Sequence, residues 1–436
     1  MKKYFLFLIS LSSLLLTSCS VSKKINLAAK KDLLRNESFI SAHTGISIYE
    51  PASGKYWYNY QGDKYFTPAS NTKLATCYVA MKYLGDSLVG ISYQEEGDSL
   101  FIFPAGDPSF LHPDFKTNPV YNFLEHTNKK IVVNTSSWQE QRWGSGWAWN
   151  DYNDDYSAER SVMPVYGNVA RFDNQAGSLQ IFPSYFSKTT FIDSIYNRHN
   201  FSNTVYREIA SNKFFIKDLH SSFNDLEVPF YTEDDSILIN LLEDTLHKTV
   251  YRSSYLKNKS DNNKIYSQAT DSVLKPMMHR SDNFFAEQNL LMVSNKLLGV
   301  MSDGKIIDTL LKTDFNDLPQ KPGWVDGSGL SRFDLFSPQD MVTILNKMKN
   351  EFGMKRIENI LATGGTGTLR SLYKKDSGFI FAKTGTLSGV VALSGFLYTR
   401  KNKLLIFSVL VNNHRSSAAN IRKAIEKFIL AVRYKN

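Results

Sequence analysis

The sequence predicts an α+β protein in which a long, mostly-β segment separates two parts that each contain helices and strands. Three observations support this prediction. An apolar stripe at helical spacing follows Ser70, residues 91–265 consist of short aromatic-rich runs separated by Asn, Asp, Ser and Gly, and longer elements return after residue 266. The 436 residues exceed the usual size of one hydrophobic core, so more than one domain is expected.

The N-terminus predicts export and a lipid anchor. Two lysines precede a short apolar run, and this run is too short for a transmembrane helix. The stretch Leu16-Thr17-Ser18-Cys19 resembles a bacterial lipobox, which predicts a signal peptide over residues 1–18 and lipidation of Cys19. The alternative is an ordinary secretory signal with a chance cysteine. Lipidation of Cys19 leaves Cys77 without a partner for an internal disulfide.

Composition excludes some classes of protein. A hydrophobic content of 42% and a charged content of 21% are typical of globular domains and exclude a disordered chain. The net charge is +9, but Lys and Arg are scattered among 42 acidic residues. This scatter argues against a nucleic-acid partner and is compatible with an anionic cell envelope.

The first part of the chain, residues 19–90, contains four predicted elements. A short helix is expected over residues 26–36, and two strands over 45–49 and 55–60 are joined by a Pro-Ala-Ser-Gly turn. A helix then begins near Ser70 and ends at Gly85. Its apolar face consists of Leu74, Cys77, Tyr78, Met81 and Leu84.

The last part, residues 266–436, contains longer elements. The segment 91–265, called the inserted segment below, leads into it through a polar linker at 256–264. We expect helices over 284–298, 338–350 and 418–432, and two apolar runs, 379–399 and 403–411, as paired strands.

A Ser-x-x-Lys pattern supplies the first candidate for catalysis. It occurs six times, starting at residues 20, 70, 254, 272, 302 and 371, so spacing alone cannot identify a nucleophile. Only Ser70 combines a preceding proline with an amphipathic helix. Residues three apart share a helix face, so Lys73 can reach the Ser70 hydroxyl and serve as its base.

Two further motifs complete the candidate site. The motif Lys383-Thr384-Gly385 occurs once, before a strand-like run. The ammonium group of Lys383 is expected to depress the pKa of Lys73 by repulsion. Thr384 and Thr386 offer hydroxyls for a carboxylate, and Gly385 allows close approach to the strand edge. Ser-Asp-Asn occurs at Ser260, inside the polar linker, and at Ser281, before a helix pattern. We select Ser281, whose hydroxyl can relay a proton while the Asn283 amide holds Lys73 and a substrate carbonyl.

The order of these three motifs and their flanking residues carry a family resemblance. The chain resembles the D-alanyl-D-alanine carboxypeptidase/endopeptidase family, the class C low-molecular-mass penicillin-binding proteins of the peptidase S13 type. The matching stretches are Pro68 to Leu74, Gly106-Asp107-Pro108, Ser281 to Asn283 with Ala286-Glu287, Asp326 to Arg332, and Ala382 to Val390.

The resemblance implies a β-lactamase/transpeptidase-like fold, with an antiparallel sheet, both chain ends together, and one or two domains inserted between the first two motifs. It also implies that Ser70 is acylated, that Lys73 is the base, and that the N–H groups of Ser70 and Thr386 form an oxyanion hole. No cofactor or metal is implied.

The expected substrates are peptidoglycan muropeptides, and β-lactam antibiotics are expected to acylate the enzyme. The expected location is the periplasmic side of the envelope. Ser20 after Cys19 favours the outer membrane for the lipid anchor. The balance of carboxypeptidase and endopeptidase activity stays open.

One position departs from the family pattern. Asn134 follows a strand-like run where relatives carry Asp, and an acid there would suit the amino end of a diaminopimelate side chain. Asn134 therefore leaves the choice of diamino acid open. A tryptophan-rich stretch at 143–149 follows, and it fits packing within the inserted segment as well as contact with glycan.

Three rival functions are compatible with parts of the sequence. A β-lactamase or esterase of the same superfamily is disfavoured because no Glu-x-x-Leu-Asn is present to speed deacylation. A zinc peptidase is disfavoured because the eight histidines are dispersed. The rival from another class is a non-catalytic envelope-binding lipoprotein on the same scaffold.

Overall fold

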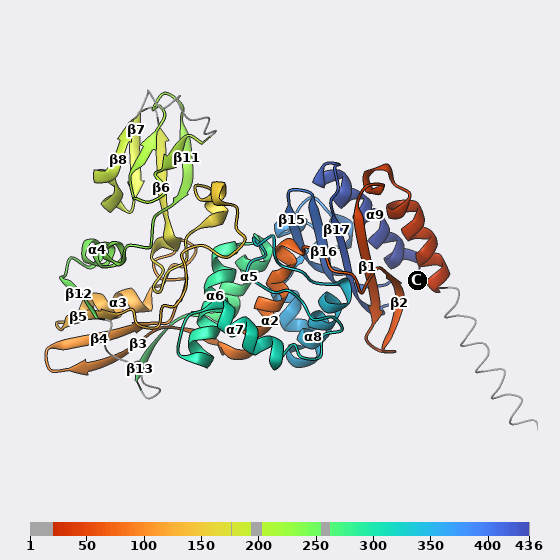
Figure 1. Cartoon of the computed structure of the whole chain (residues 1–436), viewed down its shortest axis with the longest axis horizontal. Helices are drawn as coiled ribbons and strands as arrows, with labels where there is room; N and C mark the ends of the chain where they lie inside the picture. Colours follow the sequence, from red (N-terminus) through yellow and green to blue (C-terminus); the bar gives the residue numbers. More distant parts are fainter. Residues whose placement is uncertain (1–20, 176, 193–202, 254–261, 436) are drawn as a thin grey trace, which may run out of the picture.

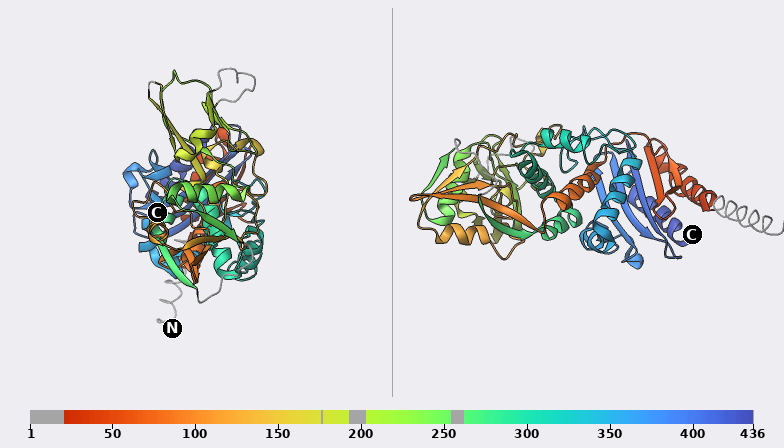
Figure 2. Two further views of the ribbon diagram at one scale, coloured as in Figure 1. Left: turned by 90° about the vertical axis from the view of Figure 1, so that its left-hand side faces the viewer. Right: turned by 90° about the horizontal axis from the view of Figure 1, so that it is seen from below.

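A computed structural model describes residues 21–175, 177–192, 203–253 and 262–435. Helices occupy the centre of the elongated molecule, and sheets lie toward both ends (Figures 1 and 2). Cys19, the predicted signal peptide and most of the predicted linker at 256–264 lie outside the described residues. Among the residues that the structure describes, no helix has the length and apolar character needed to cross a membrane.

A six-stranded sheet forms one end, in the order β14-β15-β16-β17-β1-β2. Each neighbouring pair is antiparallel, so the predicted α+β fold with an antiparallel sheet is confirmed. His43 lies opposite Asn412, which places an early strand beside the last one. The strands are β1 (His43–Glu50), β2 (Lys55–Tyr60), β14 (Ala362–Thr363), β15 (Ile380–Leu387), β16 (Val390–Tyr398) and β17 (Leu404–Asn412).

The prediction of a single strand over residues 379–399 is wrong. This run folds into the hairpin β15–β16, and β17 pairs with β16. Gly389 lies in the turn with a φ of +76°. A positive φ is readily adopted by glycine, so the chain reverses within two residues of a continuously apolar run.

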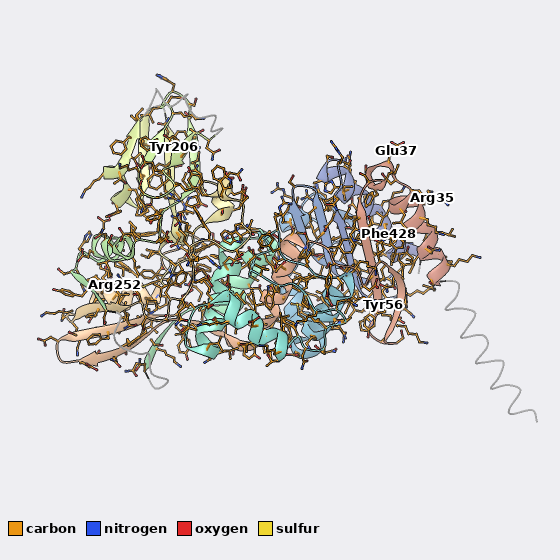
Figure 3. All side chains as sticks on the ribbon, viewed as in Figure 1. Arg35, Glu37, Tyr56, Tyr206, Arg252 and Phe428 are labelled. Atoms are coloured by element: carbon orange, nitrogen blue, oxygen red, sulfur yellow. The ribbon has the colours of Figure 1, made fainter. Side chains whose placement is uncertain are left out.

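Helices cover both faces of the sheet. On one face α8 contacts β1, β17, α2 and α5, and residues of α6 and α7 belong to the same hydrophobic cluster. On the other face α9, which carries the Phe428 labelled in Figure 3, packs with the N-terminal helical residues. The ring centroids of Phe428 and Tyr58 lie 6.5 Å apart. The helices are α2 (Lys73–Tyr83), α5 (Thr270–His279), α6 (Asn283–Leu298), α7 (Asp303–Lys312), α8 (Pro338–Ile360) and α9 (Ala418–Lys435).

Two helices differ from their predictions. The helix predicted to end at residue 350 continues to Ile360 across a kink at Gly353, because Ile357 and Ile360 beyond the kink are fully buried. The apolar stripe of α2 predicts one buried face, but every residue from 73 to 81 is buried. Helices α5, α6 and α8 all contact α2, so polar side chains such as Lys73 and Thr76 are buried too.

The described residues of the inserted segment form three further sheets, with strand orders β12-β5-β4-β3-β13, β11-β6-β7 and β8-β10-β9. They also form the helices α3 (Pro119–His126) and α4 (Asp235–Leu246), which were not predicted. The strands are β3 (Ser87–Glu96), β4 (Ser99–Pro104), β5 (Lys130–Asn134), β6 (Val169–Gln175), β7 (Ser178–Phe182), β8 (Thr190–Ile192), β9 (Val205–Arg207), β10 (Phe214–Ile216), β11 (Phe223–Pro229), β12 (Val250–Ser253) and β13 (Asn263–Ala269).

Strands β3 and β13 bring the two ends of this segment together, with Ile265 opposite Ile91. The expected boundaries at residues 91 and 265 both fall inside this pair. We therefore propose that the inserted region begins near Ser87 and ends near Ala269.

Candidate active site

Ser70 lies in a short 3-10 turn, η3 (Ala69–Thr72), that leads directly into α2. The preceding Ala69 is fully buried and has a φ of +48°. A non-glycine residue in this left-handed region is strained, and such strain is common at functional sites. The turn presents the half-buried Ser70 to a cleft at the N-terminal end of a helix.

Lys73 is fully buried beside Ser70. Its Nζ lies 3.0 Å from Ser70 Oγ, 2.5 Å from Asn283 Oδ1 and 2.7 Å from the Ser328 carbonyl oxygen. Burial lowers the pKa of Lys73 to about 8, and nearby carboxylates, Asp326 first, oppose this shift. A neutral amine donates two hydrogens, so Asn283 and Ser328 can accept both and leave the lone pair for the Ser70 hydroxyl.

Ser281 and Lys383 form a second pair. Lys383 Nζ donates to Ser281 Oγ over 2.8 Å and to the Thr384 carbonyl over 2.7 Å. Ser281 lies in the short link between α5 and α6, and its φ is +68°. The pKa of Lys383 is lowered by burial and then by the charge of Lys73. Burial is the largest cause of the lowered pKa of both lysines.

The end of β15 lies against the turn that carries Ser70. A Cβ at Gly385 would be 2.7 Å from the Pro68 carbonyl oxygen and 3.1 Å from the Ser70 nitrogen, so only glycine allows this approach. The Asn71 amide also donates to the Lys383 carbonyl over 3.0 Å. These contacts hold the Lys-Thr-Gly strand beside the serine.

A cleft of about 1020 Å³ opens beside Ser70, and Thr384 and Thr386 line it. Arg422 from α9 donates a hydrogen bond to Thr386 Oγ1. Asp151 is the one carboxylate among the described lining residues. The lining also includes the arginines Arg280, Arg332, Arg370 and Arg422. This excess of positive charge suits a substrate that ends in a carboxylate.

The structure brings together all the predicted site residues that it describes: Ser70, Lys73, Ser281, Asn283, Lys383, Thr384, Gly385 and Thr386. Cys19 lies outside the described residues. Another Ser-x-x-Lys copy begins at Ser371 on the cleft, but its Lys374 is exposed, whereas Lys73 is buried.

Asn134 is not among the residues that line the cleft. It ends β5, is 2% exposed, and accepts a hydrogen bond from Ser136 Oγ at 2.6 Å. The strand end was predicted correctly. Neighbouring strands, and not local sequence, determine where this strand end points. The cleft carboxylate comes instead from Asp151, next to the exposed Trp149.

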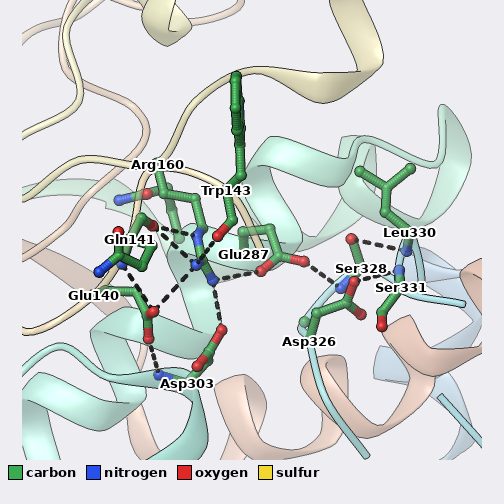
Figure 4. A network of polar contacts seen from close by, with 12 residues as sticks. Glu140, Gln141, Trp143, Arg160, Glu287, Asp303, Asp326, Ser328, Leu330 and Ser331 are labelled. Carbon is green, nitrogen blue, oxygen red and sulfur yellow. Dashed lines mark hydrogen bonds and ion pairs between the residues drawn. The ribbon is translucent and has the colours of Figure 1, made fainter. Parts of the chain in front are cut away.

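Sequence reasoning missed several groups around Lys73. The carbonyl of Ser328 and the amide carbonyl of Tyr156, which accepts from Asn283 Nδ2 over 2.8 Å, are backbone atoms with no sequence signal. Asp326 and Glu287 occur in the stretches that carry the family resemblance, but no role was assigned to them. Figure 4 shows both beside Ser328.

A buried lysine beside a serine at the start of a helix, with a second Ser–Lys pair facing it, defines a serine-type acyl-transfer enzyme. A sequence model of the D-Ala-D-Ala carboxypeptidase 3 (S13) family matches residues 27–197 and 240–432. This protein belongs to that family.

Its relatives cover most of the chain. Penicillin-sensitive carboxypeptidase A of Dictyostelium discoideum is 22% identical, over 88% of this chain and 85% of its own. The crystal structure of penicillin-binding protein 4 from Haemophilus influenzae superposes with a TM-score of 0.71 at 20% identity, over 93% and 97% of the two chains. The same protein in complex with a β-lactam gives a TM-score of 0.67 at 17% identity, over 94% and 99%.

The solved structures share the fold of this chain. Membership of the family makes the protein a serine-type D-Ala-D-Ala carboxypeptidase, a penicillin-binding hydrolase of peptidoglycan peptides in the cell envelope.

Proposed function

We propose that Ser70 is the nucleophile that forms the acyl-enzyme with the D-Ala-D-Ala end of a peptidoglycan stem peptide. The observation that carries this proposal is the 3.0 Å contact between Ser70 Oγ and the buried Lys73 amine. Serine is a weak nucleophile unless a neighbouring base takes its proton. Lys73 is the base with the right position and a lowered pKa.

In acylation, neutral Lys73 takes the Ser70 proton while Oγ bonds to the carbonyl carbon of the penultimate D-Ala. The carbon–nitrogen bond breaks, and the proton held by Lys73 passes through Ser281, which lies beside Lys383, to the leaving amine, so that Lys73 is neutral again. Water then attacks the ester, and its proton returns to Ser70. The backbone N–H groups of Ser70 and Thr386 stabilise the oxyanion.

Four residues on the cleft are proposed to bind the substrate. The hydroxyls of Thr384 and Thr386 bind the terminal carboxylate, together with Arg422, which donates a hydrogen bond to Thr386.

Asp151 lies on the same cleft and is suited to bind the ammonium group of a diamino acid in the substrate peptide. An Asp151→Asn variant should lose preference for peptides with a free side-chain ammonium over acetylated ones. An unchanged preference would exclude Asp151 from this role.

The direct test is labelling with a fluorescent penicillin. The mature protein should take up one label at Ser70, and the ester should persist because slow deacylation is expected. Ser70→Ala should abolish the label while the protein stays folded. Ser371→Ala is the matched control, because it alters another Ser-x-x-Lys serine on the same cleft and should label normally.

Each rival function predicts a different result. A non-catalytic lipoprotein takes no label, and a β-lactamase or esterase loses the label within seconds. Incubation with crosslinked and uncrosslinked muropeptides then separates endopeptidase from carboxypeptidase activity by the products released.

The lipid anchor is proposed from the sequence. The stretch Leu16-Thr17-Ser18-Cys19 supports cleavage before Cys19 and lipidation of its thiol, and Ser20 favours the outer membrane. Metabolic labelling with a fatty acid should mark the wild type and not Cys19→Ser. Membrane fractionation tests the location, and a label-free wild type would contradict the anchor.

A further inference from the structure

Ser328 connects the candidate base to a buried carboxylate. Its carbonyl oxygen accepts from Lys73 Nζ at 2.7 Å, and its own N–H donates to Glu287 Oε1 at 2.7 Å. Glu287 is 1% exposed and lies one helical turn after Asn283 on α6. The Ser328 carbonyl therefore orients Lys73, and the Ser328 N–H is held by Glu287.

The second oxygen of Glu287 faces Arg160, whose Nη1 lies 3.4 Å from Oε2 (Figure 4). Burial and then the charge of Asp326 raise the pKa of Glu287, whereas the charge of Arg160 and the hydrogen bond from Ser328 lower it. Both carboxyl oxygens of Glu287 act as acceptors, Oε1 for the Ser328 N–H and Oε2 for the Arg160 guanidinium.

Arg160 belongs to the inserted segment and is held firmly there. Its side chain is 1% exposed, and Nη2 donates to the carbonyls of Gln141 and Trp143, each over 2.9 Å. Nη1 also lies 2.6 Å from Asp303 at the start of α7. A planar guanidinium with several fixed partners is a rigid support for Glu287.

A second contact ties the inserted segment to the same loop. Trp147 Nε1 donates to Asp326 Oδ2 over 2.9 Å. The Asp326 carboxylate also accepts from the backbone nitrogens of Gly329 and Ser331 at 2.6 Å and 2.7 Å. The loop around Ser328 is thus held from the inserted segment at both Glu287 and Asp326.

We propose that Arg160 and Glu287 are positioning residues for the catalytic lysine. Arg160 fixes Glu287, Glu287 fixes the Ser328 peptide, and the Ser328 carbonyl orients the Lys73 amine toward Ser70. The inserted segment then contributes directly to the chemical step, in addition to any contact with substrate. This inference rests on the proposed role of Lys73 as base.

Neither Arg160 nor Glu287 is among the residues that line the cleft. A positioning role therefore predicts a specific kinetic signature. The maximal rate of acylation at saturating penicillin should fall, while the penicillin concentration that gives half this rate should stay the same. A structural role alone would lower the melting temperature and leave the rate per folded molecule unchanged.

The test compares Arg160→Lys with Arg207→Lys in the full mature chain. Arg207 is a matched control, because it is also fully buried in the inserted segment and is paired with Glu159 at 2.6 Å. We expect Arg160→Lys to lower the maximal acylation rate on the order of 10- to 100-fold, as for a small misplacement of a catalytic group. Arg207→Lys should stay within about twofold of the wild type, in keeping with the absence of contact to the site.

Glu287→Gln is the second variant, in case Arg160→Lys does not fold. It keeps the shape of the side chain and an acceptor for the Ser328 N–H, but it replaces the oxygen that accepts from Arg160 with an amide nitrogen that cannot accept. The same fall in maximal rate is expected. Normal maximal rates in the folded variants, with lowered melting temperatures, would overturn the proposal. Absence of label from the wild type would instead overturn the proposed function.

Discussion

Lys73 Nζ and Ser70 Oγ lie 3.0 Å apart in a pocket where the lysine is completely buried. The amine has two other partners, Asn283 and Ser328. Because a neutral amine has two hydrogens and one lone pair, these three contacts match the state in which Lys73 can accept the serine proton. The protonation state of Lys73 should therefore control the reaction.

Acylation should depend on pH through Lys73. Burial lowers its pKa to about 8, so Lys73 is mostly protonated below this pH and cannot serve as base. The acylation rate should rise about tenfold per pH unit below this pKa and level off above it. Rates of penicillin labelling at a series of pH values measure this. Lys73→Arg should not label at any pH, because a guanidinium stays protonated. A flat profile in the wild type would contradict the assignment.

Gly385→Ala should impair both stability and acylation. Its Cβ would lie 2.7 Å from the Pro68 carbonyl oxygen, so the strand or the turn that carries Ser70 must move. Overpacking of this kind costs about 1–3 kcal/mol of unfolding free energy, measured by urea unfolding. Gly304→Ala in α7 is the control, because a Cβ there has nothing within 4 Å, and it should stabilise the helix by up to about 1 kcal/mol. Wild-type labelling by Gly385→Ala would show that the close approach is dispensable.

Arg422→Ala should weaken binding of peptides that end in a free carboxylate. Arg422 lines the cleft and donates to Thr386 Oγ1. A hydrogen bond to a charged group contributes about 1.5–3 kcal/mol, so KM should rise about 10- to 100-fold. The same peptide with a C-terminal amide should show little further loss. Arg400→Ala, at an exposed position, is the control. An equal effect on both peptides would place the carboxylate elsewhere.

Arg433→Met should destabilise the docking of α9. Arg433 Nε lies 2.6 Å from Asp376 Oδ1, and the two side chains are 8% and 4% exposed. Removing one partner of a buried pair costs about 3–5 kcal/mol, because the other charge stays buried. Lys347→Met, which breaks a pair with the half-exposed Asp317, should cost less than about 1 kcal/mol. Urea unfolding gives both values, and equal losses would contradict the role of burial.

Local sequence predicted the parts of the site that local geometry determines. The three-residue spacing of Ser70 and Lys73 predicted their contact, strand-like runs predicted several of the strands, and the family resemblance implied the antiparallel sheet. The hairpin at Gly389 was missed because an apolar run gives no sign of where it reverses. The full burial of α2 was missed because its polar residues contact neighbours that are distant in the sequence.

The sequence by itself predicted the nucleophile and its base, and it identified the two companion motifs and the family. It could do so because these are side chains in fixed short patterns. Only the tertiary structure placed Lys383 beside Ser281, 102 residues away, placed the strand end at Asn134 outside the residues that line the cleft, and linked Arg160 to Lys73 through Glu287 and Ser328. These relationships depend on backbone atoms and on packing between distant elements, and neither leaves a periodic signal in the chain.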